Sequence, residues 1–320
     1  MARKVDETRD GVGLTNLDQP LFDGAEATKR DLVDHLDALD DRILAELRGR
    51  PLSVIRVHRG QEAFMQKNVP AYAPDFVATV AFWAEASKRQ VNYALCDDRQ
   101  TLLWFANQRA VEYHPTLVRA KRPEHPTHLV LDLDPPDGDG FAAAVAAARL
   151  VRTALEGVGL QGVVKTSGAK GVHVFVPMAD EVSVDDAAAA TRAIAERAAA
   201  LDPAVATTAF MKEQRDGKVF VDATRVGGTT VVAAFSPRVR PGAPVSFPVA
   251  WDDLDGVAPS DFTIHTVRER LGDVGPWLDD LEPQPLPQVL VDEGRLIQPG
   301  RVQAMHEGRR RAATARRDPG

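Results

Sequence analysis

Residues 128–134 read HLVLDLD, and this pattern is the main indication of the fold class of the 320-residue chain. Successive side chains of a β-strand point to opposite faces of a sheet. The three leucines of the stretch therefore share one face, and Asp132 and Asp134 share the other face with Val130. Two prolines follow at once and end the strand pattern. We expect a strand with an apolar core face and two carboxylates on its second face.

The segments on both sides of this strand alternate between helical and extended patterns. Downstream, we expect helices at 140–157 and 183–201, and strands at 161–166, 172–176, 218–222 and 229–235. Upstream, we expect helices at 27–48, 74–88 and 101–109, and strands at 52–57 and 91–96. The order strand–helix–strand–strand predicts an α+β (mixed α/β) fold, with helices on one face of a mixed sheet.

The same pattern predicts how the chain is divided. We expect residues 13–300 to form one folded domain, with a smaller N-terminal α/β lobe at 13–125 and a lobe at 126–300 that carries the D-x-D strand. Residues 1–12 are expected to be disordered, and the arginine-rich segment 301–320 is typical of a basic disordered tail.

Composition excludes several classes of protein. No stretch approaches 18 uncharged apolar residues, so we expect no membrane span, and the N-terminus lacks the apolar core of a signal peptide. The single cysteine, Cys96, excludes internal disulfides and a cysteine-based zinc site. These features predict a cytoplasmic protein.

The net charge of −7 is unevenly distributed. Residues 249–294 carry a net charge of −9 and residues 301–320 a net charge of +4, so the body of the chain is nearly neutral. Bulk acidity therefore does not argue against a nucleic-acid partner, whose binding would depend on local positive charge.

Three carboxylates are the first candidates for chemistry. Asp132 and Asp134 lie two residues apart on one strand, where like charges repel unless a cation lies between them. Asp222 ends the predicted strand 218–222. Three acids on neighbouring strands can bind two metal ions for nucleotidyl transfer. The alternative is that all three are solvated acids at strand surfaces and ends.

The segment KTSGAKGVH, residues 165–173, is the second candidate. It is a glycine-bracketed turn rather than a Walker loop. Backbone N–H groups in such a turn can form an anion-binding nest, and Ser167, Lys170 and His173 add polar side chains. Several arginines suited to phosphate lie near the third acid, namely Arg215, Arg225, Arg238 and Arg240. The alternative is an ordinary hairpin turn and surface arginines.

Taken together, these motifs resemble a known family. The segments HLVLDLDPPDG, KTSGAKGVHVFVP, KVFVDATR and AFSPRVRPGAPVS are similar to motifs of the polymerase domain of bacterial ligase D, an archaeo-eukaryotic primase-polymerase. Upstream matches follow in order: GLTNLDQPLF, ATKRDLVDHLD, RPLSVIR, FMQKN and VEYHPTLVRA. The resemblance covers roughly residues 14–290. It implies a primase-polymerase fold with a central mixed or antiparallel, RRM-like catalytic sheet.

The resemblance also implies roles for particular residues. Asp132, Asp134 and Asp222 would be catalytic and bind two Mn²⁺ or Mg²⁺ ions. The incoming NTP or dNTP would be held by His114, Lys165, Ser167, Lys170, His173, Arg215, Arg225, Arg238 and Arg56. DNA would be contacted by Asn16 and Lys29 at a 5′-phosphate, by Phe64 stacking on the template, and by Lys67.

The chain departs from the family pattern at several positions. Gln19 stands where the family usually has lysine, and Met65 replaces the second phenylalanine of a pair. Both changes predict weaker contacts, to a 5′-phosphate and to stacked bases respectively. The turn after Asp222 is one residue short. A K-x-D-G ligase motif is absent from the sequence, so we expect a stand-alone relative.

These observations predict a monomeric, template-dependent primase-polymerase that adds nucleotides to a primer 3′-hydroxyl by a two-metal mechanism. Gap filling, end joining and repair are the expected processes. The expected partners are DNA and, as candidates, a separate DNA ligase and an end-binding protein. Two alternatives stay open, a non-catalytic DNA-end-binding scaffold and a metal-dependent nucleotide or phosphodiester hydrolase.

Overall fold

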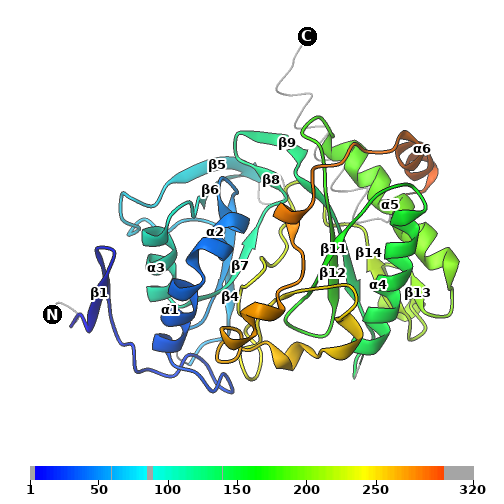
Figure 1. Cartoon of the computed structure of the whole chain (residues 1–320). Helices are drawn as coiled ribbons and strands as arrows, with labels where there is room; N and C mark the ends of the chain where they lie inside the picture. Colours follow the sequence, from blue (N-terminus) through cyan, green and yellow to red (C-terminus); the bar gives the residue numbers. More distant parts are fainter. Residues whose placement is uncertain (1–3, 59, 85–88, 139, 299–320) are drawn as a thin grey trace, which may run out of the picture.

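A computed structural model describes residues 4–58, 60–84, 89–138 and 140–298 of the chain (Figure 1). These ranges contain two larger sheets, one in each half of the sequence, with helices packed against each of them. The predicted α+β class is confirmed.

The D-x-D strand lies inside a six-stranded sheet, in the order β13-β14-β10-β12-β11-β15. All neighbours are antiparallel except β13 and β14. The strands are β10 (His128–Asp134), β11 (Val163–Thr166), β12 (Val172–Pro177), β13 (Ala206–Thr207), β14 (Val219–Asp222) and β15 (Pro248–Val249). The D-x-D strand therefore has one motif strand on each side, β12 on one and β14 on the other.

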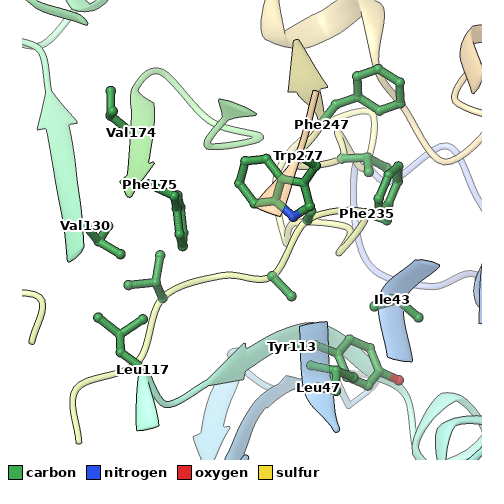
Figure 2. Close-up of a cluster of buried hydrophobic side chains, with 14 of the residues drawn as sticks. Ile43, Leu47, Tyr113, Leu117, Val130, Val174, Phe175, Phe235, Phe247 and Trp277 are labelled. Carbon is green, nitrogen blue, oxygen red and sulfur yellow. The ribbon is translucent and has the colours of Figure 1, made fainter. Parts of the chain in front are cut away.

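Two alanine-rich helices cover one face of this sheet (Figure 1). They are α4 (Phe141–Glu156) and α5 (Val184–Leu201), and the shorter α6 (Gln288–Leu296) packs on α5. Part of the other face is also buried. Val130, which shares it with Asp132, belongs to the cluster in Figure 2, where side chains from α2, β7, the sheet and residues 235–277 meet.

The N-terminal half forms a five-stranded sheet in the order β4-β3-β6-β5, with β7 also paired to β3. Its strands are β3 (Leu52–Arg56), β4 (Phe64–Gln66), β5 (Thr79–Ala84), β6 (Arg89–Ala94) and β7 (Ala110–Pro115). The helices of this half are α1 (Lys29–Ala38), α2 (Asp40–Leu47) and α3 (Arg99–Asn107), and β8 (Val118–Arg119) and β9 (Arg122–Pro126) form a small hairpin. The side chain of Thr28 caps α1.

Three expectations for local structure are wrong. Within the range 74–88, where we expected a helix, residues 79–84 form β5, whose β-branched and aromatic residues pair with β6, and residues 85–88 lie outside the described residues. The helix at 27–48 is broken at Leu39 into α1 and α2. Residues 229–235 form no strand: they run beside β7 with one isolated bridge, and the chain turns away at Phe235, which has a positive φ of 64°.

The expected disorder at 1–12 is also wrong where the structure describes it. Residues 7–14 form a hairpin of β1 (Glu7–Arg9) and β2 (Val12–Leu14). The Arg9 guanidinium ties this hairpin to α1 through Asp34 and Asp37, at 2.6 and 2.9 Å. Residues 1–3 and the predicted tail at 301–320 lie outside the described residues. In the described part, no helix is long and apolar enough to cross a membrane.

The contact between α5 and α6 gives a test of the packing. A Cβ atom on Gly294 of α6 would run into the backbone of Ala189 in α5. Alanine normally favours a helix over glycine by about 1 kcal/mol, but overpacking costs roughly 1–3 kcal/mol. We therefore expect Gly294→Ala to lower the free energy of unfolding in denaturant titration. Gly228→Ala, which has open space around it, is the control and should change the stability little.

Candidate active site

Strand register brings four predicted residues into one row across the main sheet. Asp132 on β10 lies opposite Asp222 on β14 and opposite His173 on β12, and His173 lies opposite Lys165 on β11. Directly opposed residues of antiparallel strands point to the same face. The row Lys165–His173–Asp132–Asp222 therefore crosses four strands on a single face.

The two acids of this row share one internal cation. Arg225 lies between them, 3.3 Å from Asp132 Oδ2 and 3.3 Å from Asp222 Oδ2. Burial disfavours ionisation of Asp132, but His173 and Arg225 outweigh it and hold the pKa of Asp132 well below its usual range. Burial and the nearby Asp132 charge raise the pKa of Asp222 despite Arg225. The pair therefore needs a positive charge beside it.

Asp134 is the most exposed of the three acids and has its own cationic neighbours. Arg215 Nη1 lies 3.2 Å from Asp134 Oδ2, and Lys170 Nζ lies 3.7 Å from Oδ1. Within the described ranges, no three histidine, cysteine or acidic side chains converge as a ready metal site. The oxygen donors suit Mg²⁺ or Mn²⁺, but Arg225, Arg215 and Lys170 would have to release them.

Lys165 supports His173 from inside the protein. Its side chain is completely buried, and burial lowers the pKa of Lys165 to about 7 and that of His173 to about 4. Lys165 Nζ donates to His173 Nδ1 at 3.0 Å and to Ser246 Oγ, whose hydroxyl donates to the Thr166 carbonyl. With Nδ1 accepting, neutral His173 directs its Nε2–H toward Asp132 Oδ1, 3.3 Å away. Lys165 is buried and does not line the cleft, and its expected contact with the nucleotide stays a prediction.

An open cleft of about 900 Å³ begins at Asp132 and Asp134. The predicted nucleotide ligands that line it are Ser167, Lys170, His173 and Arg238, and Arg240 lines it as well. Gly168 has a φ of +67°, and a Cβ there would come within 2.8 Å of the Ser246 nitrogen, so this position requires glycine. Within the turn, Ser167 Oγ already accepts from the N–H groups of Ala169 and Gly171, so these two donors are not free for an anion.

Glu112 is a residue of this region that sequence reasoning missed. Its Oε2 accepts from His114 Nε2 at 2.8 Å and lies 3.0 Å from Arg238 Nε, while Oε1 accepts from the Val239 N–H. Burial opposes its ionisation, but His114 and Arg238 lower the pKa of Glu112 to about 2. Arg238 also donates to the Ser167 carbonyl. The sequence could have indicated Glu112 only through its spacing, because it lies two residues from His114 and therefore on the same face of the strand.

His114 and Arg56 do not reach the cleft. His114 contacts Glu112 and does not line the cavity. Arg56 donates to the Gln108 carbonyl, to Gln66 Oε1 and to the Tyr72 hydroxyl, all within the N-terminal half. Its expected contact with the nucleotide stays a prediction.

The predicted DNA contacts also lie in the N-terminal half. Lys29 is 3 % exposed, and its ammonium donates to the Thr15 carbonyl at 2.5 Å and to Asn107 Oδ1 at 2.6 Å. Asn16 is exposed, and Gln19 donates to its side-chain oxygen at 3.4 Å. The structure thus places Asn16, Gln19 and Lys29 near one another, and the Lys29 ammonium already donates hydrogen bonds to Thr15 and Asn107.

The predicted stacking region lies on β4. Phe64 is 39 % exposed and stacks on His58, with 5.4 Å between ring centroids. Its neighbour Met65 is 45 % exposed, and Lys67 is exposed just beyond the strand. These side chains are available to a partner, but none of them lines the cleft.

Comparison with known proteins gives consistent matches. The model of the LigD primase-polymerase domain matches residues 28–277. The chain is similar to the bifunctional non-homologous end joining protein LigD of Bacillus subtilis, with 33% identity over 83% of this chain and 43% of the relative. It is equally similar to the multifunctional LigD of Mycobacterium tuberculosis, with 33% identity over 85% of this chain and 37% of the relative. The chain thus spans about two-fifths of the length of these relatives.

A solved structure shares the fold. The polymerase domain of Mycobacterium tuberculosis ligase D, in complex with DNA, is 30% identical with a TM-score of 0.76. The match covers 84% of this chain and 96% of that structure. The family model spans most of the chain, including all three acids, and the solved domain has the same architecture. The chain belongs to the LigD primase-polymerase domain family.

Proposed function

We propose that this protein is a template-dependent nucleotidyltransferase that adds NTPs or dNTPs to a primer 3′-hydroxyl. The observation that carries the proposal is the position of Asp132, which lines the cleft and lies directly opposite Asp222 on the neighbouring strand. Asp134 shares their face, and the phosphate-binding groups Ser167, Lys170 and Arg238 line the same cleft. An acidic centre beside basic and hydroxyl groups suits phosphoryl transfer.

Asp132, Asp134 and Asp222 would hold two Mn²⁺ or Mg²⁺ ions, which would lower the pKa of the primer hydroxyl and stabilise the charge on the leaving pyrophosphate. His173 contacts Asp132 Oδ1. Asp132 Oδ2 is therefore the oxygen that would bind a cation together with Asp222. Arg225 occupies that position here, so we expect it to move when a divalent ion binds.

The cleft would hold the triphosphate. Lys170 and Arg238 supply positive charge, and Ser167 supplies a hydroxyl. Arg238 is fixed by Glu112 and the Ser167 carbonyl, so part of its ordering is complete before a nucleotide arrives. Pre-organisation of this kind lowers the entropic cost of binding.

DNA is the proposed partner because the similar solved domain was determined with DNA. The names of the full-length relatives suggest end joining as the setting. A separate DNA ligase and an end-binding protein are the corresponding proposed partners.

Removal of either carboxylate tests the activity directly. We expect Asp132→Ala and Asp134→Ala each to reduce primer extension on a gapped template with Mn²⁺ by at least ~10³-fold, since loss of one preorganised charge-stabilising group costs about 10²–10³ and a metal ligand is lost as well. The exposed Asp180→Ala is the control, and thermal melts should show that all variants fold. Wild-type DNA binding without extension would instead support a scaffold, and nucleotide hydrolysis without DNA would support a hydrolase.

Glu112→Gln tests the ordering of Arg238. The variant keeps the shape of the side chain but removes its charge. Hydrogen bonds to charged groups contribute about 1.5–3 kcal/mol, so we expect the KM for the nucleotide to rise roughly 10-fold or more and kcat to change less. The exposed Glu181→Gln should leave both unchanged. A fall in kcat at constant KM would contradict the assigned role.

The 5′-phosphate pocket gives a third test. Because Gln19 is neutral and the Lys29 ammonium is engaged by Thr15 and Asn107, we expect little preference for a 5′-phosphate over a 5′-hydroxyl at the gap. Gln19→Lys should create such a preference by adding a charge-assisted contact. Binding of matched gapped substrates, measured by fluorescence anisotropy, checks both statements. A strong preference in the wild type would show that other residues bind the phosphate.

A further inference from the structure

Phe235 has a backbone conformation that its residue type rarely adopts. Its φ of 64° lies in the left-handed region that favours glycine. The side chain is nevertheless 3 % exposed and belongs to the apolar cluster in Figure 2. A residue keeps such a conformation only where the surrounding contacts determine it. Contacts from outside the segment therefore hold Phe235 in place.

A histidine of the N-terminal half supplies one of these contacts. His35, on α1, is 1 % exposed, and its Nε2 lies 2.9 Å from the carbonyl oxygen of Phe235. A carbonyl oxygen only accepts hydrogen bonds, so Nε2 is the nitrogen that carries the proton. Burial lowers the pKa of His35 to about 4, so the ring is neutral near neutral pH. It therefore donates a single hydrogen bond, to Phe235.

The second ring nitrogen of His35 shows that this bond is the purpose of the side chain. Nδ1 is buried, and no group among the described residues bonds to it. A buried polar atom without a partner destabilises the fold, and an apolar side chain of similar shape would avoid that cost. Filling the core does not explain a histidine here, whereas the contact with the Phe235 carbonyl does.

Three backbone hydrogen bonds form a short ladder that begins at Phe235 and ends at Arg238. The Phe235 N–H donates to the Ser246 carbonyl at 2.7 Å, and the Ser246 N–H donates to the Ser236 carbonyl at 3.0 Å. The Arg238 N–H donates to the Pro244 carbonyl at 2.8 Å. A change in the backbone at Phe235 would therefore be passed along the ladder to the arginine.

The ladder is also packed against the candidate site. The Ser246 hydroxyl accepts from Lys165 Nζ, which donates to His173 Nδ1 at 3.0 Å. A Cβ atom on Gly168 would come within 2.8 Å of the Ser246 nitrogen and 2.7 Å of Arg238 Cγ. The ladder therefore has little space in which to shift without disturbing the turn beside it.

Arg238 reaches the cleft from the end of this ladder, and its side chain lines the cleft with Lys170. Glu112 acts on its guanidinium, 3.0 Å from Nε, whereas His35 acts on the backbone that carries it. We infer that His35 is a positioning residue for the nucleotide, because its bond to the Phe235 carbonyl sets the place from which Arg238 meets the triphosphate. This inference rests on the proposed function.

Nucleotide binding without DNA tests the role of His35. We expect His35→Leu to weaken binding of a nucleoside triphosphate with Mn²⁺ roughly 3- to 10-fold in isothermal titration, as expected for one lost hydrogen bond. His35→Asn, whose amide stops short of the carbonyl, should do the same. His35→Gln keeps an N–H donor within reach and should restore most of the affinity.

Val33→Ala is the matched control, because it removes buried atoms from the same helix but leaves the contact. It should lower the melting temperature without changing the nucleotide affinity. Wild-type affinity in both His35→Leu and His35→Asn would overturn the inference.

An Arg238→Ala background tests whether His35 acts through the arginine. If it does, adding His35→Leu should cause little further loss of nucleotide affinity, since effects that share one route are not additive. A general packing role would give the same loss in both backgrounds, and such additive losses would contradict the inference.

Backbone exchange provides a readout that does not depend on activity. The amide hydrogens of Phe235, Arg238 and Ser246 should exchange faster in His35→Leu than in the wild type, because the ladder opens more easily. His35→Gln should slow the exchange again. Exchange in α4, on the other face of the main sheet, should not change.

These measurements separate the two proposals. If the wild type binds the triphosphate with the expected dependence on His35 but does not extend a primer, the polymerase function fails and the positioning role remains. If it extends primers but His35→Leu changes neither nucleotide affinity nor exchange, the function remains and the positioning role is wrong.

Discussion

The antiparallel register of β10 is the constraint on which the candidate site depends. Because Asp132 is paired with His173 on one side and with Asp222 on the other, the sheet itself determines which side chains meet. A shift of one residue in either pairing would move the opposed side chain to the other face. The apolar residues of both faces oppose such a shift, since Val130 and the leucines of β10 are all buried. Core packing and site geometry are therefore specified by the same strand.

Charge pairing around the cleft is the second organising feature of the molecule. Each of the three acids has a cationic partner in this structure. Glu112, in turn, is the carboxylate that contacts Arg238 and His114. Removing one member of a buried pair leaves an uncompensated charge, which is strongly destabilising. A divalent ion would replace the cationic side chains beside the acids, and a triphosphate would add a negative partner for the basic side chains. The charge of the site would therefore stay balanced when these ligands bind.

The two halves of the chain meet around β7. Residues 231 and 233 donate to carbonyls of β7, and Glu112 of the same strand accepts from Val239. The cluster in Figure 2 continues this contact with Tyr113, Phe235 and Trp277. Arg238 thus reaches the cleft from a segment that is held by the N-terminal sheet. The expected division into lobes at 13–125 and 126–300 therefore does not describe Arg238, whose position depends on contacts with both lobes.

Local patterns in the sequence were enough to predict the strand that carries Asp132 and Asp134, the motif strands beside it, the alanine-rich helices and the residue types suited to phosphate. Strand alternation, helical spacing and turn glycines are signals that a short segment carries alone. The resemblance of the motifs to a known family predicted the primase-polymerase fold. Other features became visible only in the folded chain: Lys165 is buried beneath His173, Glu112 orders Arg238, Arg56 has its partners in the N-terminal half, and residues 79–84 form a strand. These outcomes depend on cross-strand register and on contacts between residues more than 100 positions apart, such as Glu112 and Val239, which no local pattern records.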